Sequence, residues 1–182
     1  NGLTQRAHLE LQADGHEVYL ELAISDRQMI EAVRAVKPEL IICPFLKTKI
    51  PEAIWHKTRT IIIHPGIVGD RGPSSLDWAI HNGETHWGVT ALEASENFDA
   101  GDIWATETFA MRTAPKASIY RQEVTDAAIN CILKTVKKVQ AGEQPTPLHA
   151  MKNVKGKSRP LMTQADRKID WQKNIPAGQD VN

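Results

Sequence analysis

The architecture is indicated most clearly by the run Thr60-Ile61-Ile62-Ile63-His64-Pro65-Gly66. Its three isoleucines form a short apolar run that ends in turn-forming residues, which is typical of a strand buried on both faces of a sheet. A second run, Leu40-Ile41-Ile42-Cys43-Pro44, has the same character. Helical patterns precede and separate the two runs, so we predict parallel strands joined by right-handed crossovers.

The rest of the chain alternates between helical and strand patterns. Apolar residues at helical spacing predict helices over residues 3–13, 26–36, 53–55, 75–82 and 118–141. Further strands are predicted over residues 18–22, 87–93 and 103–111, the last two as an antiparallel extension. The chain is therefore expected to adopt an α/β fold with a doubly wound, mostly parallel, Rossmann-like sheet. An opening helix in such a fold normally follows a strand, so we expect the first strand of the sheet to be missing.

Composition narrows the classes of function. The 182 residues carry 22 basic and 22 acidic side chains, and this balance gives no electrostatic reason to expect a nucleic-acid or membrane partner. No apolar stretch approaches the roughly 20 residues that a membrane-spanning helix needs. Cys43 and Cys131 lie in an apolar run and on a predicted helix, which suits reduced thiols in the cytoplasm.

A change in composition follows the last predicted helix. Residues 142–147 contain glycine and proline, and residues 148–182 are polar and poor in apolar side chains. We therefore assign residues 1–147 to the main domain and residues 148–182 to a linker or docking tail.

Polar residues gather where strands end, which is where ligands bind on open α/β sheets. His64 directly follows the three isoleucines, and glycines make the loop after it permissive to a close ligand. Asp99 lies in a turn about 35 residues later. A histidine and an aspartate so placed can face one cleft, where the carboxylate would orient the imidazole. Taken singly, each residue also fits a plain loop hydrogen bond or an Asx turn.

Other chemistries lack their motifs. Neither a glycine-rich dinucleotide fingerprint nor a P-loop occurs in the sequence. His81, Glu84 and His86 lie close together in the sequence, but Gly83 should end the helix between them. That break removes the single-face geometry of a zinc site, so we expect no metal.

Several short motifs follow one another along nearly the whole chain. They are Ile62-Ile63-His64-Pro65-Gly66, Arg71-Gly72-Pro73-Ser74-Ser75, the segment 82–90, Phe98-Asp99-Ala100-Gly101-Asp102-Ile103 and Ile169-Asp170-Trp171. Together they resemble the folate-dependent formyltransferases, a superfamily that includes methionyl-tRNA formyltransferase and the hydrolase domain of 10-formyltetrahydrofolate dehydrogenase. The resemblance implies a formyltransferase fold for residues 1–147 and 10-formyltetrahydrofolate as formyl donor.

The sequence of residues 64–78 resembles that of the hydrogenase-maturation branch of this superfamily. In that branch a crotonase-like domain follows the formyltransferase-like one, and the pair is implicated in supplying carbon monoxide to nickel-iron hydrogenase. The resemblance thus implies hydrogenase-maturation machinery as partner, and a tail at 148–182 that leads toward a crotonase-like domain absent from this chain. The formyl acceptor stays open between water, coenzyme A and another nucleophile.

The resemblance also implies roles for single residues. His64 would donate to the oxyanion and relay a proton, and Asp99 would orient His64 and assist proton movement. The family has asparagine two residues before the histidine, where this chain has Ile62. Losing one such oxyanion donor costs roughly 10² to 10³ in rate. The competing hypothesis is therefore a binding module that keeps the folate pocket but has lost activity.

We expect the folate to enter beside the loop after residues 40–43. Phe45, Leu46 and Ile50 would form an apolar wall for the pterin, beside Ile62, although simple core packing is an alternative. Lys47 and Lys49 would meet the glutamate tail of the folate or remain solvated.

We expect the formyl acceptor to bind at the glycine-containing loop that follows His64. Asp70, Arg71 and Gly72 of this loop are assigned to substrate binding. Arg71 would bind a phosphate or carboxylate of the acceptor, or form an ion pair with Asp70 or Asp77.

Overall fold

The structure is a computed structural model and describes residues 2–167. Its centre is a four-stranded sheet in the order β1-β2-β3-β4, with β1 (Leu40–Pro44), β2 (Arg59–His64), β3 (His86–Glu93) and β4 (Ile103–Ala110). Strands β1 and β2 are parallel, whereas β2 with β3 and β3 with β4 are antiparallel. The sheet is thus mixed, which corrects the expectation of a mostly parallel one, and the predicted β3–β4 extension is antiparallel as expected.

The connection from β2 to β3 contains little regular structure. After a loop, the only helix in it is α4 (Ser75–His81), whose seven residues span about 10 Å. The six residues of β2 span about 20 Å. The chain does not return along β2, and β3 starts beyond the carboxyl end of β2 and runs the opposite way.

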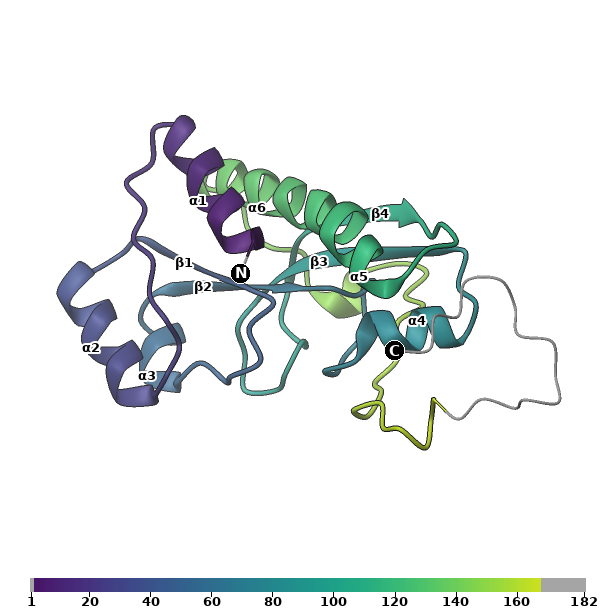
Figure 1. Cartoon of the computed structure of the whole chain (residues 1–182). Helices are drawn as coiled ribbons and strands as arrows, with labels where there is room; N and C mark the ends of the chain where they lie inside the picture. The colour runs from purple at the N-terminus through teal and green to yellow at the C-terminus, as the bar shows by residue number, and fades with distance from the viewer. Residues whose placement is uncertain (1, 168–182) are drawn as a thin grey trace, which may run out of the picture.

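Helices cover both faces of the sheet (Figure 1). Helices α1 (Gly2–Ala13) and α6 (Thr125–Gln140) lie on one face, and α2 (Asp26–Val36) and α3 (Glu52–Trp55) on the other. Helix α5 (Lys116–Ile119) runs into α6 through a π-helical turn, Tyr120–Val124.

The core has two parts, one on each face of the sheet. Successive side chains of β2 point alternately into one part and the other. Ile61 and Ile63 are fully buried in the larger cluster, which α1, α4 and α6 cover. Ile62 points to the other face and packs on the smaller cluster, whose buried members are Met29, Cys43, Ile50 and Ile54. Since side chains two apart on a strand share a face, His64 lies on the same face as Ile62.

Residues 16–24 form no strand, which corrects the expectation for residues 18–22. Their side chains Tyr19, Leu20, Leu22 and Ile24 are exposed. Alternation alone does not make a strand, because backbone groups also need a neighbouring strand to bond. Among the described residues β1 is the edge strand on its side of the sheet, and residues 16–24 do not pair with it. The missing first strand remains a prediction.

Part of the segment after residue 147 is packed on the domain rather than free. A 3-10 turn, Leu148–Ala150, is followed by residues 156–162, which we call the strap. Three main-chain hydrogen bonds join the strap to the loop at residues 66–75, called here the glycine loop. The boundary at residue 147 stays a prediction, whereas the strap belongs structurally to the domain; the Ile169-Asp170-Trp171 motif lies outside the described residues.

Candidate active site

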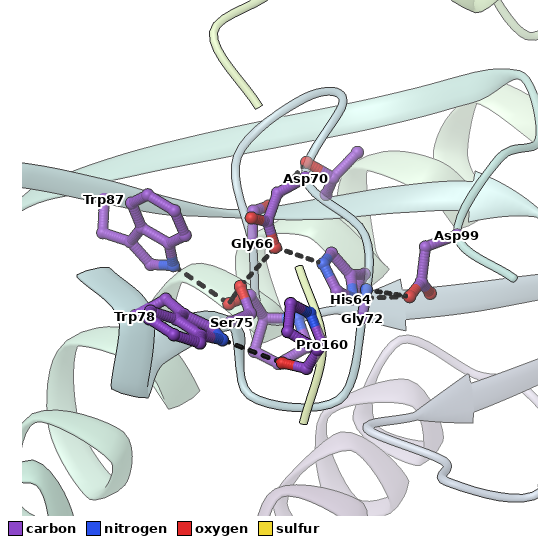
Figure 2. Close-up of polar contacts among 11 residues, drawn as sticks. His64, Gly66, Asp70, Gly72, Ser75, Trp78, Trp87, Asp99 and Pro160 are labelled. Atoms are coloured by element: carbon purple, nitrogen blue, oxygen red, sulfur yellow. Dashed lines mark hydrogen bonds and ion pairs between the residues drawn. The ribbon is translucent and has the colours of Figure 1, made fainter. Parts of the chain in front are cut away.

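The carboxyl end of β2 places His64 between two carboxylates (Figure 2). Its Nδ1 lies 3.3 Å from Oδ2 of Asp99, and its Nε2 lies 2.9 Å from Oδ2 of Asp70. The residue is 4% exposed, so both contacts are shielded from water. The expected meeting of His64 and Asp99 is therefore present in the structure, together with a second acid that sequence analysis did not pair with the histidine.

Asp99 is presented by the loop between β3 and β4. Its backbone has a φ of +52°, in the left-handed region that aspartate tolerates better than most residues. The loop folds closely, since a Cβ on Gly101 would overlap the carbonyl of Glu93. The backbone N–H of Gly72 donates to Asp99 Oδ2 over 3.3 Å. The carboxylate thus has a fixed place beside the imidazole and still keeps 12% of its side-chain surface exposed.

Asp70 lies on the other side of the imidazole and is nearly inaccessible, with 2% of the residue exposed. The Ser75 hydroxyl lies 2.6 Å from Asp70 Oδ2, the oxygen that also contacts His64. Oδ1 is buried and has no hydrogen-bond partner among the described residues. A substrate group has no access to this carboxylate, which corrects the expectation that Asp70 binds substrate: burial makes it a partner of His64.

The two contacts of His64 decide how many N–H donors the ring needs to satisfy them. A neutral imidazole has one N–H donor, whereas the imidazolium has two. Each nitrogen of His64 faces an oxygen that accepts when ionised. A ring that donates to both carboxylates would carry both N–H protons, whereas a neutral ring can donate to only one of them.

A hollow opens on the Asp99 side of the histidine. Its walls include Leu46, Lys49, Ile50 and Ile62 from the smaller-cluster face, and Phe98 and Asp99 from the opposite loop. Three residues predicted from the sequence for the folate, namely Leu46, Ile50 and Ile62, are thereby brought together. The lining mixes apolar side chains with polar ones, among them the carboxylates of Glu93 and Asp99, and small-molecule sites commonly combine the two.

Two other predicted folate residues lie elsewhere. Phe45 has a φ of +52° and packs edge-on against Tyr120, with ring centroids 5.2 Å apart, on the larger core. Lys47 is exposed and does not line the hollow. The expectation that Phe45 forms the pterin wall is therefore corrected, because its backbone conformation turns the ring into the core.

Several lining residues were missed from the sequence, and two of them are aromatic. Trp55 of α3 lines the hollow, and its indole N–H has no hydrogen-bond partner among the described residues. Phe98 is 57% exposed at the rim. Both could have been suspected, since Phe98 precedes the candidate aspartate and Trp55 ends the short helix that follows the predicted pterin loop.

Arg71 and Gly72 have separate roles in the glycine loop. Gly72 holds Asp99 through its N–H, as described above. Arg71 forms no ion pair with either acid proposed from the sequence, because Asp70 pairs with His64 and Asp77 pairs with Lys116 and Arg167. Its binding of an acceptor remains a prediction.

Thiol and metal chemistry find no support in residues 2–167. Burial raises the pKa of Cys43 to about 12, and burial also raises the pKa of Cys131 to about 12, so both thiols stay protonated and are poor nucleophiles. Within the same residues no three His, Cys, Asp or Glu side chains are grouped so that they could hold a metal ion. None of the helices described there is both long and apolar enough to cross a membrane.

Comparison with known proteins agrees with this geometry. Residues 7–136 match the family model described as formyl transferase. The hydrogenase maturation factor HoxX of Bradyrhizobium diazoefficiens is 47% identical over 176 residues, which are 94% of this chain and 30% of HoxX. The crystal structure of HypX from Aquifex aeolicus in complex with tetrahydrofolic acid superposes with a TM-score of 0.90 at 48% identity, covering 98% of this chain and 31% of HypX.

A more distant solved structure shares the fold alone. Methionyl-tRNA formyltransferase from Clostridium thermocellum has a TM-score of 0.72 at 15% identity, over 95% of this chain and 74% of that one. The chain spans about 30% of the length of HoxX and HypX. The family model alone matches well over half of the residues, and the resemblance noted in the sequence is thereby confirmed. The chain belongs to the formyl transferase family.

Proposed function

We propose that this chain removes the formyl group from 10-formyltetrahydrofolate and passes it to an acceptor. The observation that carries the proposal is the pair His64 Nδ1 and Asp99 Oδ2, which lie 3.3 Å apart, with Asp99 lining the hollow. Membership of the formyl transferase family and the tetrahydrofolic acid bound in HypX support the same chemistry.

The two side chains have complementary tasks in such a transfer. The acceptor's lone pair forms a bond to the formyl carbon, and the carbonyl electrons move onto its oxygen. The Nδ1–H of His64 donates to that oxyanion, while Asp99 takes the proton that the acceptor loses. The bond between the formyl carbon and N10 then breaks, and N10 receives the proton from Asp99.

The walls of the hollow suit the donor. Leu46, Ile50 and Ile62 offer the pterin an apolar surface, and Phe98 at the rim adds an aromatic face. Lys49 is positioned to meet the anionic glutamate tail, with Lys47 beside it in the sequence. The acceptor is water, coenzyme A or another nucleophile, and Arg71 is the nearby cation that an anionic acceptor would use.

In the full-length protein we assign this reaction to hydrogenase maturation. HoxX, 47% identical, is a hydrogenase maturation factor, and its length leaves room for a further domain. We propose residues 1–147 as the formyltransferase-like unit and residues 148–182 as the connection to a crotonase-like domain, which would take the formyl group on toward carbon monoxide. Two buried, free cysteines suit the reducing cytoplasm as the place of action.

A second candidate is a folate-binding module without turnover. Two observations favour it: Ile62 offers no donor to the formyl oxygen, and both nitrogens of His64 are already in contact with carboxylates. On this alternative the hollow binds folate but the imidazole never reaches the formyl group.

Incubation of the full-length protein with 10-formyltetrahydrofolate, with and without coenzyme A, separates the two candidates. We expect tetrahydrofolate to appear with turnover, and a rate that rises with coenzyme A if this is the acceptor. Calorimetric binding of tetrahydrofolate is measured on the same preparation. Binding without formyl release would favour the module and contradict the proposed reaction.

A further inference from the structure

We propose that Asp70 is a positioning residue for His64, and that the strap holds Asp70 in place from about 90 residues further along the chain. The proposal rests on the proposed function for its kinetic consequence, because it concerns the imidazole assigned to the formyl group. The geometric part stands on contacts within the described residues alone.

Asp70 and His64 form a short, buried contact. The two atoms, Oδ2 and Nε2, are 2.9 Å apart, and the exposed fractions of the side chains are 1% and 4% (Figure 2). The Ser75 hydroxyl lies 2.6 Å from the same oxygen and 2.8 Å from the carbonyl of Pro65. With Nε2 engaged in this way, the ring cannot rotate without losing a buried charged contact, so Nδ1 is the nitrogen directed to Asp99 and the hollow.

The glycine loop packs closely around that contact. A Cβ on Gly66 would overlap His64 Nε2 and Asp70 Oδ2, so only glycine leaves space for the pair. The carbonyl of Gly66 accepts from the Thr90 hydroxyl over 2.8 Å, which ties the loop to β3. The loop is therefore anchored to the sheet at the start, directly after His64.

The strap anchors the rest of the glycine loop. The N–H of Gly156 donates to the carbonyl of Val68 over 3.1 Å. Arg71 donates to the carbonyl of Lys157 over 3.1 Å and accepts from the N–H of Arg159 over 2.9 Å. These bonds flank Asp70 on both sides, so the strap determines where its carboxylate lies.

Further contacts continue along the strap. The N–H of Met162 donates to the Ser74 hydroxyl over 3.0 Å, and the Trp78 indole donates to the carbonyl of Pro160 over 2.8 Å. Met162 is itself buried. The strap is thus held at both ends.

Gly156 is the point where strap and loop meet most tightly. A Cβ there would collide with backbone atoms of Val68, Gly69 and Asp70. Gly156 is not among the glycines with positive φ, so alanine fits its backbone conformation and differs only by the added methyl group. Gly156→Ala therefore pushes the glycine loop away without a separate backbone cost.

The experiment observes His64 directly by ¹⁵N-imidazole NMR, with the His64→Gln variant to assign its signals. In Asp70→Asn we expect the Nε2 signal to move and formyl release to fall roughly ten- to a hundredfold, while tetrahydrofolate affinity stays within about twofold. Gly156→Ala should move the same signal in the same direction. Lys155→Ala, an exposed neighbour on the same segment, is the matched control and should leave it in place.

An unchanged Nε2 signal in folded Asp70→Asn or folded Gly156→Ala would overturn the proposal. Should either variant fail to fold, Ser75→Ala replaces it, because removing one hydroxyl contact to Asp70 should still shift the signal. The NMR readout needs no turnover, so a wild type that releases no formyl would contradict the proposed function while the signal still decides the role of Asp70.

Discussion

The two sides of the His64 imidazole differ in how they are built. On the Nε2 side, Asp70 is buried under a loop that the strap covers and that bonds to β3. On the Nδ1 side, Asp99 is part of a loop that borders an open hollow and presents an exposed Phe98 at its rim. We propose that the packed side fixes the ring and that the open side receives the ligand. On this proposal, Asp70 orients the imidazole and Asp99 takes part in the chemistry.

Removing the imidazole should have the largest effect, because both sides act through it. We expect His64→Ala to lower formyl release by about 10² or more while tetrahydrofolate binding largely survives, since the imidazole interacts most strongly with charge that develops in the transition state. Turnover and calorimetric binding are measured together. The exposed His149→Ala is the control, and normal turnover in His64→Ala would refute the assigned chemistry.

Changing the acid on the open side should come next. Asp99→Asn keeps the shape of the loop and its contact with the Gly72 N–H but cannot take a proton from the acceptor. We expect formyl release to fall by roughly 10². Asp102→Asn in the same turn should retain wild-type turnover. Equal losses in the two variants would mean that the loop, rather than the Asp99 carboxylate, matters.

A donor added on the open side tests the same idea in reverse. Ile62→Asn places an amide two residues before His64 on the face that borders the hollow. If the missing oxyanion donor limits transfer, the rate of transfer to the acceptor should rise severalfold; an amide that stays unpaired would instead lower stability by about 1–3 kcal/mol. Single-turnover transfer and thermal unfolding of the same variant distinguish these results. A stable variant with an unchanged rate speaks against the limitation.

The packed and open sides should also differ in stability. Met162→Ala removes a buried side chain from the strap and should lower the free energy of unfolding by about 2 kcal/mol or more. Phe98→Ala removes a largely exposed ring and should change it by less than about 0.5 kcal/mol, while weakening tetrahydrofolate binding. Chemical denaturation gives both values. Similar losses of stability at the two positions would erase the difference between the sides.

The sequence was sufficient where the signal was local or came from ordered motifs. The strand end at His64, the loop at Asp99 and the lining by Leu46, Ile50 and Ile62 all follow from such signals. The direction of β3 relative to β2 did not follow from the sequence, because a strand buried on both faces has the same apolar run in either orientation.

Contacts between distant segments were beyond such reasoning. Residues 18–22 alternate like a strand but lack a neighbour to pair with among the described residues. The partnership of Asp70 with His64 depends on where the strap holds the glycine loop, and the strap lies in a polar tail with no periodic pattern. The side chain of Phe45 is turned into the core by a positive φ that its sequence does not announce.

The most direct test of the division between the two sides is a ¹⁵N-imidazole NMR titration of the full-length protein with a stable 10-formyl folate analogue. We predict that the Nδ1 signal of His64 shifts as the analogue binds, because the formyl oxygen enters on the Asp99 side, while the Nε2 signal held by Asp70 stays in place. A titration in which the analogue binds and only the Nε2 signal moves, or neither moves, would contradict the account.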